Sequence, residues 1–81
     1  MTTIVWSKDD CPHCTQAKSM LESKRIKFIE KKIGRDVTRE ELLEAVPNAR
    51  TVPQIFLYGK HIGGLQQLKK YFEEHDMWRS D

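Results

Sequence analysis

The chain has 81 residues, of which 38% are hydrophobic and 32% are charged, and its formal net charge is +2. This length predicts a single domain over residues 1–81 with a modest core, and the composition excludes a disordered chain. A charge of +2 is too small to indicate nucleic-acid binding, and the basic residues between positions 24 and 32 are expected to form a solvated face. No apolar run has the length of a secretion signal or of a membrane span, so we expect a cytosolic protein without membrane contact.

The first half of the chain predicts a strand, a loop, a helix and a second strand. Residues 3–6 form a β-branched and aromatic run, and residues 7–10 form a polar turn. Apolar residues then recur at helical spacing at Ala17, Met20 and Leu21. Residues 28–33 alternate between apolar and polar as a strand does, and we expect this strand to end at Gly34.

A second helix is expected next. Thr38 and Glu41 have the spacing of a capping box, in which each side chain binds the backbone N–H of the other residue. Apolar residues follow at helical spacing at Leu42, Leu43 and Val46. We expect the helix to stop before Pro47, because proline disfavours helical geometry in the residue that precedes it.

The last third of the chain predicts a hairpin and a final helix. Residues 54–58 form a third strand, and Gly59-Lys60 a two-residue turn. Residues 61–62 form a fourth strand that enters Gly63-Gly64. The final helix begins at about residue 65, with an inner face at Leu68, Tyr71 and Phe72. The order β-α-β-α-β-β-α predicts an α/β fold in which three helices flank a mixed four-stranded sheet.

The two cysteines of the chain stand three positions apart behind the first strand, in the run Cys11-Pro12-His13-Cys14. If Cys11 caps the helix and Pro12 occupies its first turn, Cys14 lies one helical turn further on and within disulfide reach. Unpaired N–H groups and the macrodipole at a helix start favour a thiolate there. The spacing therefore predicts reversible redox chemistry with Cys11 as the nucleophile.

Three other interpretations of the cysteine pair stay open at this point. A structural disulfide is one, although so short a loop constrains the unfolded chain very little. A zinc site is another, with its remaining ligands drawn from His13, His61 and His75. Two inert buried thiols are the third, but Pro12 and the polar residues 8–10 favour an exposed loop.

Three motifs together resemble those of a small dithiol glutaredoxin, a member of the thioredoxin-like superfamily. They are the run from Cys11 to Cys14, the run Thr51-Val52-Pro53-Gln54-Ile55-Phe56, and the run His61-Ile62-Gly63-Gly64. The resemblance covers almost the whole chain. It implies the thioredoxin-like fold and a cytosolic, monomeric oxidoreductase without a permanently bound cofactor. It also implies glutathione as the reducing co-substrate, and proteins that carry disulfides or bound glutathione as substrates.

The resemblance implies a glutathione-binding site around the cysteine pair. Val52-Pro53 matches the family's cis-proline, which leaves the backbone N–H and C=O of Val52 free for a substrate in extended form, and Thr51 belongs to the same run. Lys8 matches a family lysine near the thiol and a glutathione carboxylate, and its charge favours the thiolate. His13 stands where the family often has tyrosine, and its imidazole is expected to tune the pKa of the reactive cysteine or to act as a proton donor.

The glycine pair before the last helix is the other implied part of that site. Gly63-Gly64 matches a backbone nest that receives a carboxylate of glutathione, and Leu65 and Gln66 follow it. Many glutaredoxins have an aspartate where this chain has Gln66, and that aspartate meets the ammonium of the γ-glutamyl group. We therefore expect Gln66→Asp to tighten glutathione binding.

The mechanism that the resemblance implies is thiol–disulfide exchange. Cys11 attacks a substrate disulfide, and either Cys14 or glutathione then releases Cys11 from the mixed disulfide. Two other functions remain open from the sequence. One is a thioredoxin-like electron carrier recharged by a flavoprotein reductase, for example for ribonucleotide reductase, and the other is a non-catalytic zinc or protein-binding module.

Overall fold

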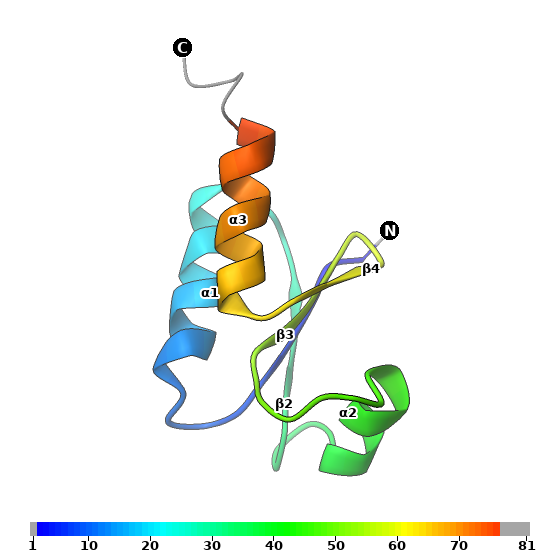
Figure 1. The fold of residues 1–81 in the computed structure, drawn as a ribbon. Coiled ribbons are helices and arrows are strands. Elements are labelled where there is room, and N and C mark those ends of the chain that lie inside the picture. The colour runs from blue at the N-terminus through cyan, green and yellow to red at the C-terminus, as the bar shows by residue number, and fades with distance from the viewer. Residues whose placement is uncertain (1, 77–81) are drawn as a thin grey trace.

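The structure is a computed structural model that describes residues 2–76. Along the chain it contains β1 (Ile4–Ser7), α1 (Pro12–Ser23), β2 (Ile29–Lys32), α2 (Arg39–Ala45), β3 (Gln54–Leu57), β4 (Lys60–Gly63) and α3 (Leu65–Asp76) (Figure 1). This is the predicted order β-α-β-α-β-β-α. Met77 and Trp78, whose contacts the sequence leaves open, lie outside the described residues.

The four strands form one mixed sheet in the order β2-β1-β3-β4. β1 runs parallel to β2, and β3 runs antiparallel to both β1 and β4. Because β3 is antiparallel to β1, the start of β3 lies beside the end of β1, with Gln54 opposite Trp6. The loop that follows β1 and the segment that precedes β3 therefore meet at one edge of the sheet.

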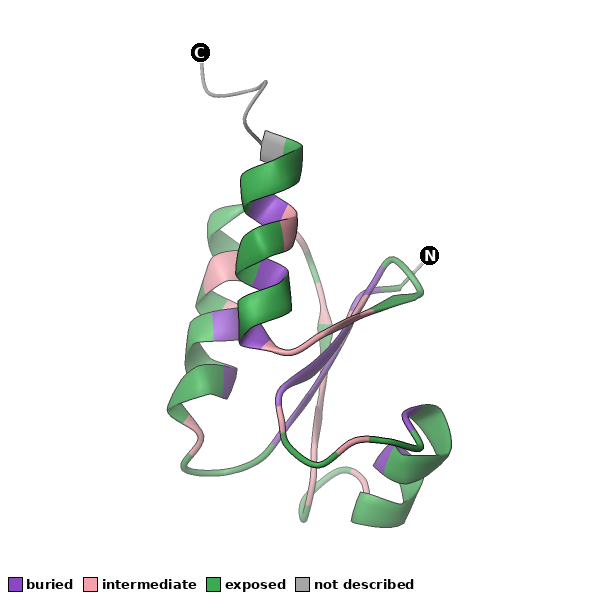
Figure 2. Cartoon of the chain, viewed as in Figure 1, coloured by how far each residue is buried: buried purple, intermediate pink, exposed green. Residues whose placement is uncertain are grey.

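Helices cover both faces of the sheet. α1 and α3 lie side by side on one face, and α2 lies on the other (Figure 1). Side chains alternate along β1, so Val5 packs toward α1 and α3 while Trp6 packs toward α2. Figure 2 shows buried residues along the central strands and on the inward sides of α1 and α3, whereas α2 is largely exposed. The larger core is thus the one beneath α1 and α3.

The starts of α1 and α2 follow the predicted capping patterns. Cys11 is the N-cap of α1, and Pro12 occupies its first position. In α2, the Glu41 backbone N–H donates to Thr38 Oγ1 at 3.2 Å, and the Thr38 N–H donates to Glu41 Oε2 at 2.6 Å. The capping box is therefore confirmed, and α2 ends before Pro47 as expected.

The β3–β4 turn differs from the prediction. Tyr58 and Gly59 occupy the turn, with φ of 51° and 88°, and Lys60 already pairs with Leu57. Hairpin turns with two residues of positive φ match the twist of the strands, and glycine in the second of the two positions makes this turn favourable. The prediction that placed Tyr58 in the strand and the turn at Gly59-Lys60 was wrong by one residue.

β2 is also shorter than predicted, by one residue at each end. It begins at Ile29 and ends at Lys32, while Ile33 makes an isolated bridge to Val37. None of the helices within residues 2–76 combines the length and the apolar character that crossing a membrane requires.

Candidate active site

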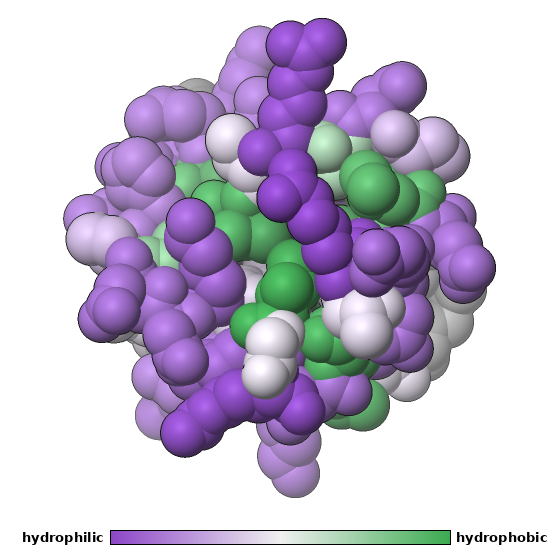
Figure 3. Space-filling model, turned by 90° about the horizontal axis from the view of Figure 1, so that it is seen from below, coloured by the Kyte–Doolittle hydropathy of each residue, from purple (hydrophilic) through white to green (hydrophobic). Residues whose placement is uncertain are grey.

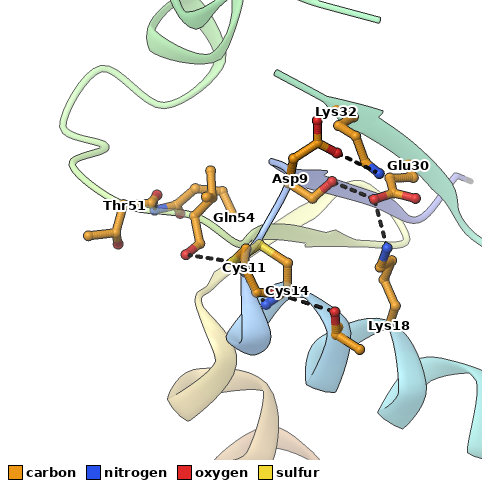
Figure 4. The surroundings of a disulfide bond; sticks show 11 residues. Asp9, Cys11, Cys14, Lys18, Glu30, Lys32, Thr51 and Gln54 are labelled. Atoms are coloured by element: carbon orange, nitrogen blue, oxygen red, sulfur yellow. Dashed lines mark hydrogen bonds and ion pairs between the residues drawn. A yellow bond between two sulfur atoms is a disulfide. The ribbon is translucent and has the colours of Figure 1, made fainter. Parts of the chain in front are cut away.

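The two cysteines lie at the N-terminus of α1 and form a disulfide, with their Cα atoms 5.2 Å apart (Figure 4). The backbone N–H of Cys14 donates to Cys11 Sγ at 3.1 Å. Cys14 is 1% exposed, whereas Cys11 is partly exposed. A substrate can therefore reach Cys11 but not Cys14. In the reduced protein the same N–H and the start of α1 stabilise a negative charge on Cys11.

The segment before β3 lies against the cysteine pair. The peptide bond between Val52 and Pro53 is cis, as the resemblance implied. The carbonyl oxygen of Val52 lies 3.9 Å from Cys11 Sγ, and Pro53 is buried. The backbone of Val52 therefore lies beside the sulfur atom to which a substrate would become linked.

Two side chains behind this segment hold it in place. Gln54 Nε2 donates to the carbonyl oxygen of Thr51 at 2.9 Å (Figure 4). The Gln54 Oε1 in turn lies 2.9 Å from His61 Nε2, which must carry the proton for this contact to be a hydrogen bond. Gln54 is 9% exposed. The hydrogen bonds thus connect β4 through β3 to the segment that faces Cys11.

The glycine pair lies where β4 ends and α3 begins. Gly63 has a φ of 124°, and a Cβ there would lie 2.9 Å from Gln67 Cγ. The backbone N–H of Gly64 donates to Gln67 Oε1 at 2.9 Å. A Cβ on Gly64 would lie 3.4 Å from the carbonyl oxygen of Pro53, so the start of α3 lies directly beside the cis-proline. Gln67 thus binds the Gly64 N–H in this structure, and the role of the glycine pair as a nest for a carboxylate stays a prediction.

An open groove of about 480 Å³ brings most of the predicted residues together. The predicted residues in its wall are Lys8, Cys11, His13, Thr51, Val52, Pro53, Gly64, Leu65 and Gln66. Gly63 and Cys14 do not line it, since Gly63 lies in β4 against Gln67 and Cys14 is buried behind Cys11. This groove joins the start of α1, the segment before β3 and the start of α3.

A network of charged groups fixes α1 to the sheet one turn beyond Cys14. Glu30 Oε2 accepts hydrogen bonds from Lys18 Nζ at 2.8 Å and from Ser7 Oγ at 2.5 Å (Figure 4). Burial raises the pKa of Glu30, but the hydrogen bonds from Lys18 and Ser7 and the charges of Lys18 and Lys32 together hold the pKa below its ordinary value. Glu30 is therefore ionised at neutral pH and joins α1, β1 and β2.

The zinc interpretation of the cysteine motif finds no ligand set in the described part of the chain. Within residues 2–76 no three or more His, Cys, Asp or Glu side chains are grouped to hold a metal ion. His13 lies on α1, His61 on β4 beside Gln54, and His75 on α3 beside Tyr71. The three histidines thus belong to separate surroundings.

A comparison with protein families agrees with this geometry. The glutaredoxin family model matches residues 3–62 of the chain. The chain belongs to the glutaredoxin family. Glutaredoxins are thiol–disulfide oxidoreductases, and the Cys11–Cys14 pair is the group that such an activity uses.

Two characterised relatives differ in how much of their length this glutaredoxin spans. Glutaredoxin 3 of Escherichia coli strain K12 is 42% identical over 65 residues, which cover 79% of this chain and 77% of that protein. The hybrid peroxiredoxin hyPrx5 of Haemophilus influenzae is 44% identical over 68 residues, which cover 84% of this chain but only 28% of the relative. Most of that relative thus lies outside the match.

Solved glutaredoxin structures share the fold. Glutaredoxin 1 from Francisella tularensis, solved in complex with cacodylate, has a TM-score of 0.77 at 29% identity and covers 90% of this chain and 93% of its own. A buckwheat glutaredoxin in complex with glutathione has a TM-score of 0.79 at 23% identity and covers 95% of this chain and 73% of its own. The resemblance inferred from the motifs is therefore confirmed for family and fold.

The sequence did not lead to a role for Arg50 or Gln67, or to the contact between His61 and Gln54, in this glutaredoxin site. Arg50 lines the groove beside Thr51, and its place directly before the Thr51-Val52-Pro53 run was an available signal. Gln67 stands three residues after Gly64, the spacing at which a glutamine reaches back to an N-cap N–H, so this contact also had a signal. The contact of His61 with Gln54 had none, because it depends on how β3 and β4 pair.

Proposed function

We propose that this glutaredoxin is a monomeric, cytosolic enzyme that uses glutathione to reduce protein disulfides and glutathione mixed disulfides. The observation that carries the proposal is the position of Cys11. Its sulfur lies at the start of α1, beside the Val52 carbonyl, in a groove that also holds Lys8 and Arg50. A reactive thiol, a free backbone edge and two cations in one groove suit a small anionic peptide such as glutathione.

The proposed catalytic cycle uses the two cysteines in sequence. The Cys11 thiolate attacks one sulfur of a substrate disulfide, so that a Cys11–substrate disulfide forms and the other substrate sulfur leaves as a thiolate. Cys14 then loses its proton and attacks Cys11 Sγ, which releases the substrate as a thiol and forms the Cys11–Cys14 disulfide. Two glutathione molecules reduce this disulfide and leave as glutathione disulfide. The disulfide in the structure corresponds to the oxidised end of this cycle.

Glutathione fits the groove with its cysteinyl part beside Cys11. Its backbone is proposed to pair with Val52, and one carboxylate to approach Lys8 and Arg50, since these are the cations in the groove wall. The other carboxylate is proposed to approach the start of α3 at Leu65 and Gln66. The buckwheat glutaredoxin, which has the same fold, was solved in complex with glutathione.

The proposal is tested by the redox state of the cysteine pair. The protein is equilibrated in buffers with varied ratios of reduced to oxidised glutathione, quenched, and analysed by mass spectrometry. We expect the pair to convert smoothly between dithiol and disulfide, with a glutathione adduct on Cys11 as a minor species. A pair that stays reduced, or stays oxidised, at every ratio would contradict the proposal.

One observation favours a second function, an electron carrier recharged by a flavoprotein reductase. Gln67 Oε1 accepts the hydrogen bond of the Gly64 N–H, and Gln66 offers no negative charge to the ammonium of glutathione. Both features weaken the glutathione end of the groove without touching the cysteines. Reduction of the disulfide by NADPH and a flavoprotein reductase, in buffer without glutathione, would support the carrier over the glutathione-dependent enzyme.

A further inference from the structure

A second pocket adjoins the active-site groove beneath α2. Its volume is about 140 Å³, and Ile33, Leu42, Leu43 and Ala49 form its apolar wall. Cavities of about 150 Å³ with aliphatic walls hold a molecule the size of benzene. The pocket therefore has room for one side chain of the size of leucine, methionine or phenylalanine.

The pocket is continuous with the surroundings of Cys11. Lys8, Thr51 and Val52 line both the pocket and the groove, and so does Arg50. The Val52 carbonyl oxygen is 3.9 Å from Cys11 Sγ. Because an extended chain advances about 3.3 Å per residue, a peptide bound to Cys11 and running along this segment brings a nearby side chain to the pocket.

The charges at the pocket have one sign. Lys8, Arg39 and Arg50 line it, and no aspartate or glutamate does. Among residues 2–76, no carboxylate forms an ion pair with any of these three cations. Figure 3, a view of the molecule from below, shows hydrophobic residues in the middle of this face with hydrophilic residues around them. The pocket thus combines an apolar interior with a basic rim.

Leu43 is the most exposed apolar side chain of this pocket. It is 37% exposed, which makes it one of three large apolar side chains so exposed in the described residues. Glutathione consists of γ-glutamate, cysteine and glycine, and so has no apolar side chain that could cover Leu43. The pocket therefore fits a larger occupant that glutathione cannot replace.

The geometry points to this pocket as a docking site for a protein client, namely an extended client segment with an aliphatic or aromatic residue close to its reactive cysteine and an acidic residue beside it. The inference rests on the proposed function, because the disulfide with Cys11 is what brings the client to the pocket. The apolar residue covers Leu43, and the acidic residue pairs with the basic rim. The pocket thereby selects among protein disulfides and leaves small disulfides unaffected.

The test compares symmetric disulfides, each formed by two copies of one cysteine peptide, so that the substrate contains no glutathione part to compete for Lys8 and Arg50. One peptide series carries leucine at each position near the cysteine in turn, with an aspartate beside it. A matched series has serine in place of leucine, and another has lysine in place of aspartate. For at least one leucine position we expect the wild type to show a kcat/KM about tenfold above that of the serine peptide. The kcat/KM for the lysine peptide should be lower than that for the aspartate peptide, and this difference should shrink as salt is added.

Two variants connect the preference to the pocket. Leu43→Gln should reduce the leucine-to-serine ratio to about one while leaving the rate on the serine peptide unchanged, and circular dichroism checks that the variant is folded. Ile29→Gln is the matched control, because Ile29 is 53% exposed on β2 and lines neither cavity. It should keep the wild-type preference.

The outcomes separate the docking site from the proposed function. If the wild type reduces the leucine and serine peptide disulfides with equal kcat/KM at every position, the docking site is overturned and the proposed function stands. An equal loss on both peptides in Leu43→Gln also overturns it. If the wild type reduces none of these peptide disulfides with glutathione present, the proposed function fails and the docking site fails with it.

Discussion

Cys11 is partly exposed at the N-cap of α1, whereas Cys14 is 1% exposed. The exposed sulfur is the one that a substrate meets first, and the buried sulfur of Cys14 can attack only Cys11 Sγ. We predict that Cys11→Ser abolishes reduction of every disulfide. Cys14→Ser should lose reduction of protein disulfides but retain removal of glutathione from mixed disulfides. Assays on both substrate types decide this, and activity in Cys11→Ser would show that the nucleophile is wrongly assigned.

Gln66 offers a second prediction at the same scale. A hydrogen bond to a charged group contributes about 1.5–3 kcal/mol, and Gln66 provides no carboxylate for the ammonium of glutathione. Gln66→Asp should therefore lower the KM for a glutathione mixed disulfide by about tenfold. Gln66→Asn is the matched control, because it has the size of aspartate without the charge, and it should not lower the KM. Equal KM values for the two variants would mean that the side chain at position 66 does not meet the ammonium.

The roles of residues that stand inside a recognisable sequence motif could be predicted. Roles that depend on contacts between distant elements could not. Cys11, Pro53 and Lys8 stand in recognisable runs and do face the groove. Gln54 lies within such a run, but its role depends on His61, which reaches it only because β3 and β4 pair. Gln67 is a local exception, because its spacing of three residues from Gly64 already predicts a hydrogen bond to the Gly64 N–H.

At the scale of elements, helical spacing and capping signals predicted the helices closely, since both are local. Strand limits were less certain, because pairing rather than sequence decides where a strand stops. The β3–β4 turn shows this: the strand-forming residues 54–58 extend through Tyr58, but the turn has positive φ at both of its positions and consists of Tyr58 and Gly59. The pairing of β3 with β4 thus places the turn one residue earlier in the chain than the sequence predicted.

The start of α2 carries the third prediction. Thr38 is exposed and its hydroxyl accepts the Glu41 N–H, so Thr38→Ala removes a cap without opening a core cavity. Loss of such a cap costs about 1 kcal/mol, and we expect this decrease in the free energy of unfolding. Urea denaturation followed by circular dichroism measures it. Ser19→Ala, an exposed position within α1, is the control and should be within a few tenths of a kcal/mol of the wild type. An unchanged midpoint for Thr38→Ala would contradict the capping role.

For the whole molecule, the Glu30 network connects stability to pH. The pKa of Glu30 is lowered in the folded protein, mainly because hydrogen bonds from Lys18 and Ser7 outweigh the effect of burial. A carboxyl group with a lowered folded pKa adds stability above its unfolded pKa and loses it as the pH falls through the folded value. The stabilisation from Glu30 should therefore be complete at neutral pH and decrease below the ordinary glutamate pKa of 4.5.

Glu30→Gln tests this dependence. At pH 7 we expect the variant to unfold more easily than the wild type by about 1 kcal/mol or less, because the pair with Lys18 is partly exposed. The difference should narrow as the pH is lowered below 4.5. Glu22→Gln, at an exposed position of α1, is the control and should follow the wild type. A difference that stays constant with pH would show that the loss comes from packing and not from charge.

The burial of Cys14 also limits how copies of this protein can become linked to one another. A chain with two accessible thiols can form disulfides to two neighbours and so grow into a covalent polymer under oxidising conditions. Here only Cys11 is reachable from outside, and Cys14 is close enough to displace any neighbour that Cys11 captures. Oxidation of a concentrated sample should therefore stop at single chains with the Cys11–Cys14 disulfide. Any covalent dimer that forms should disappear, because Cys14 attacks Cys11 Sγ and displaces the linked neighbour.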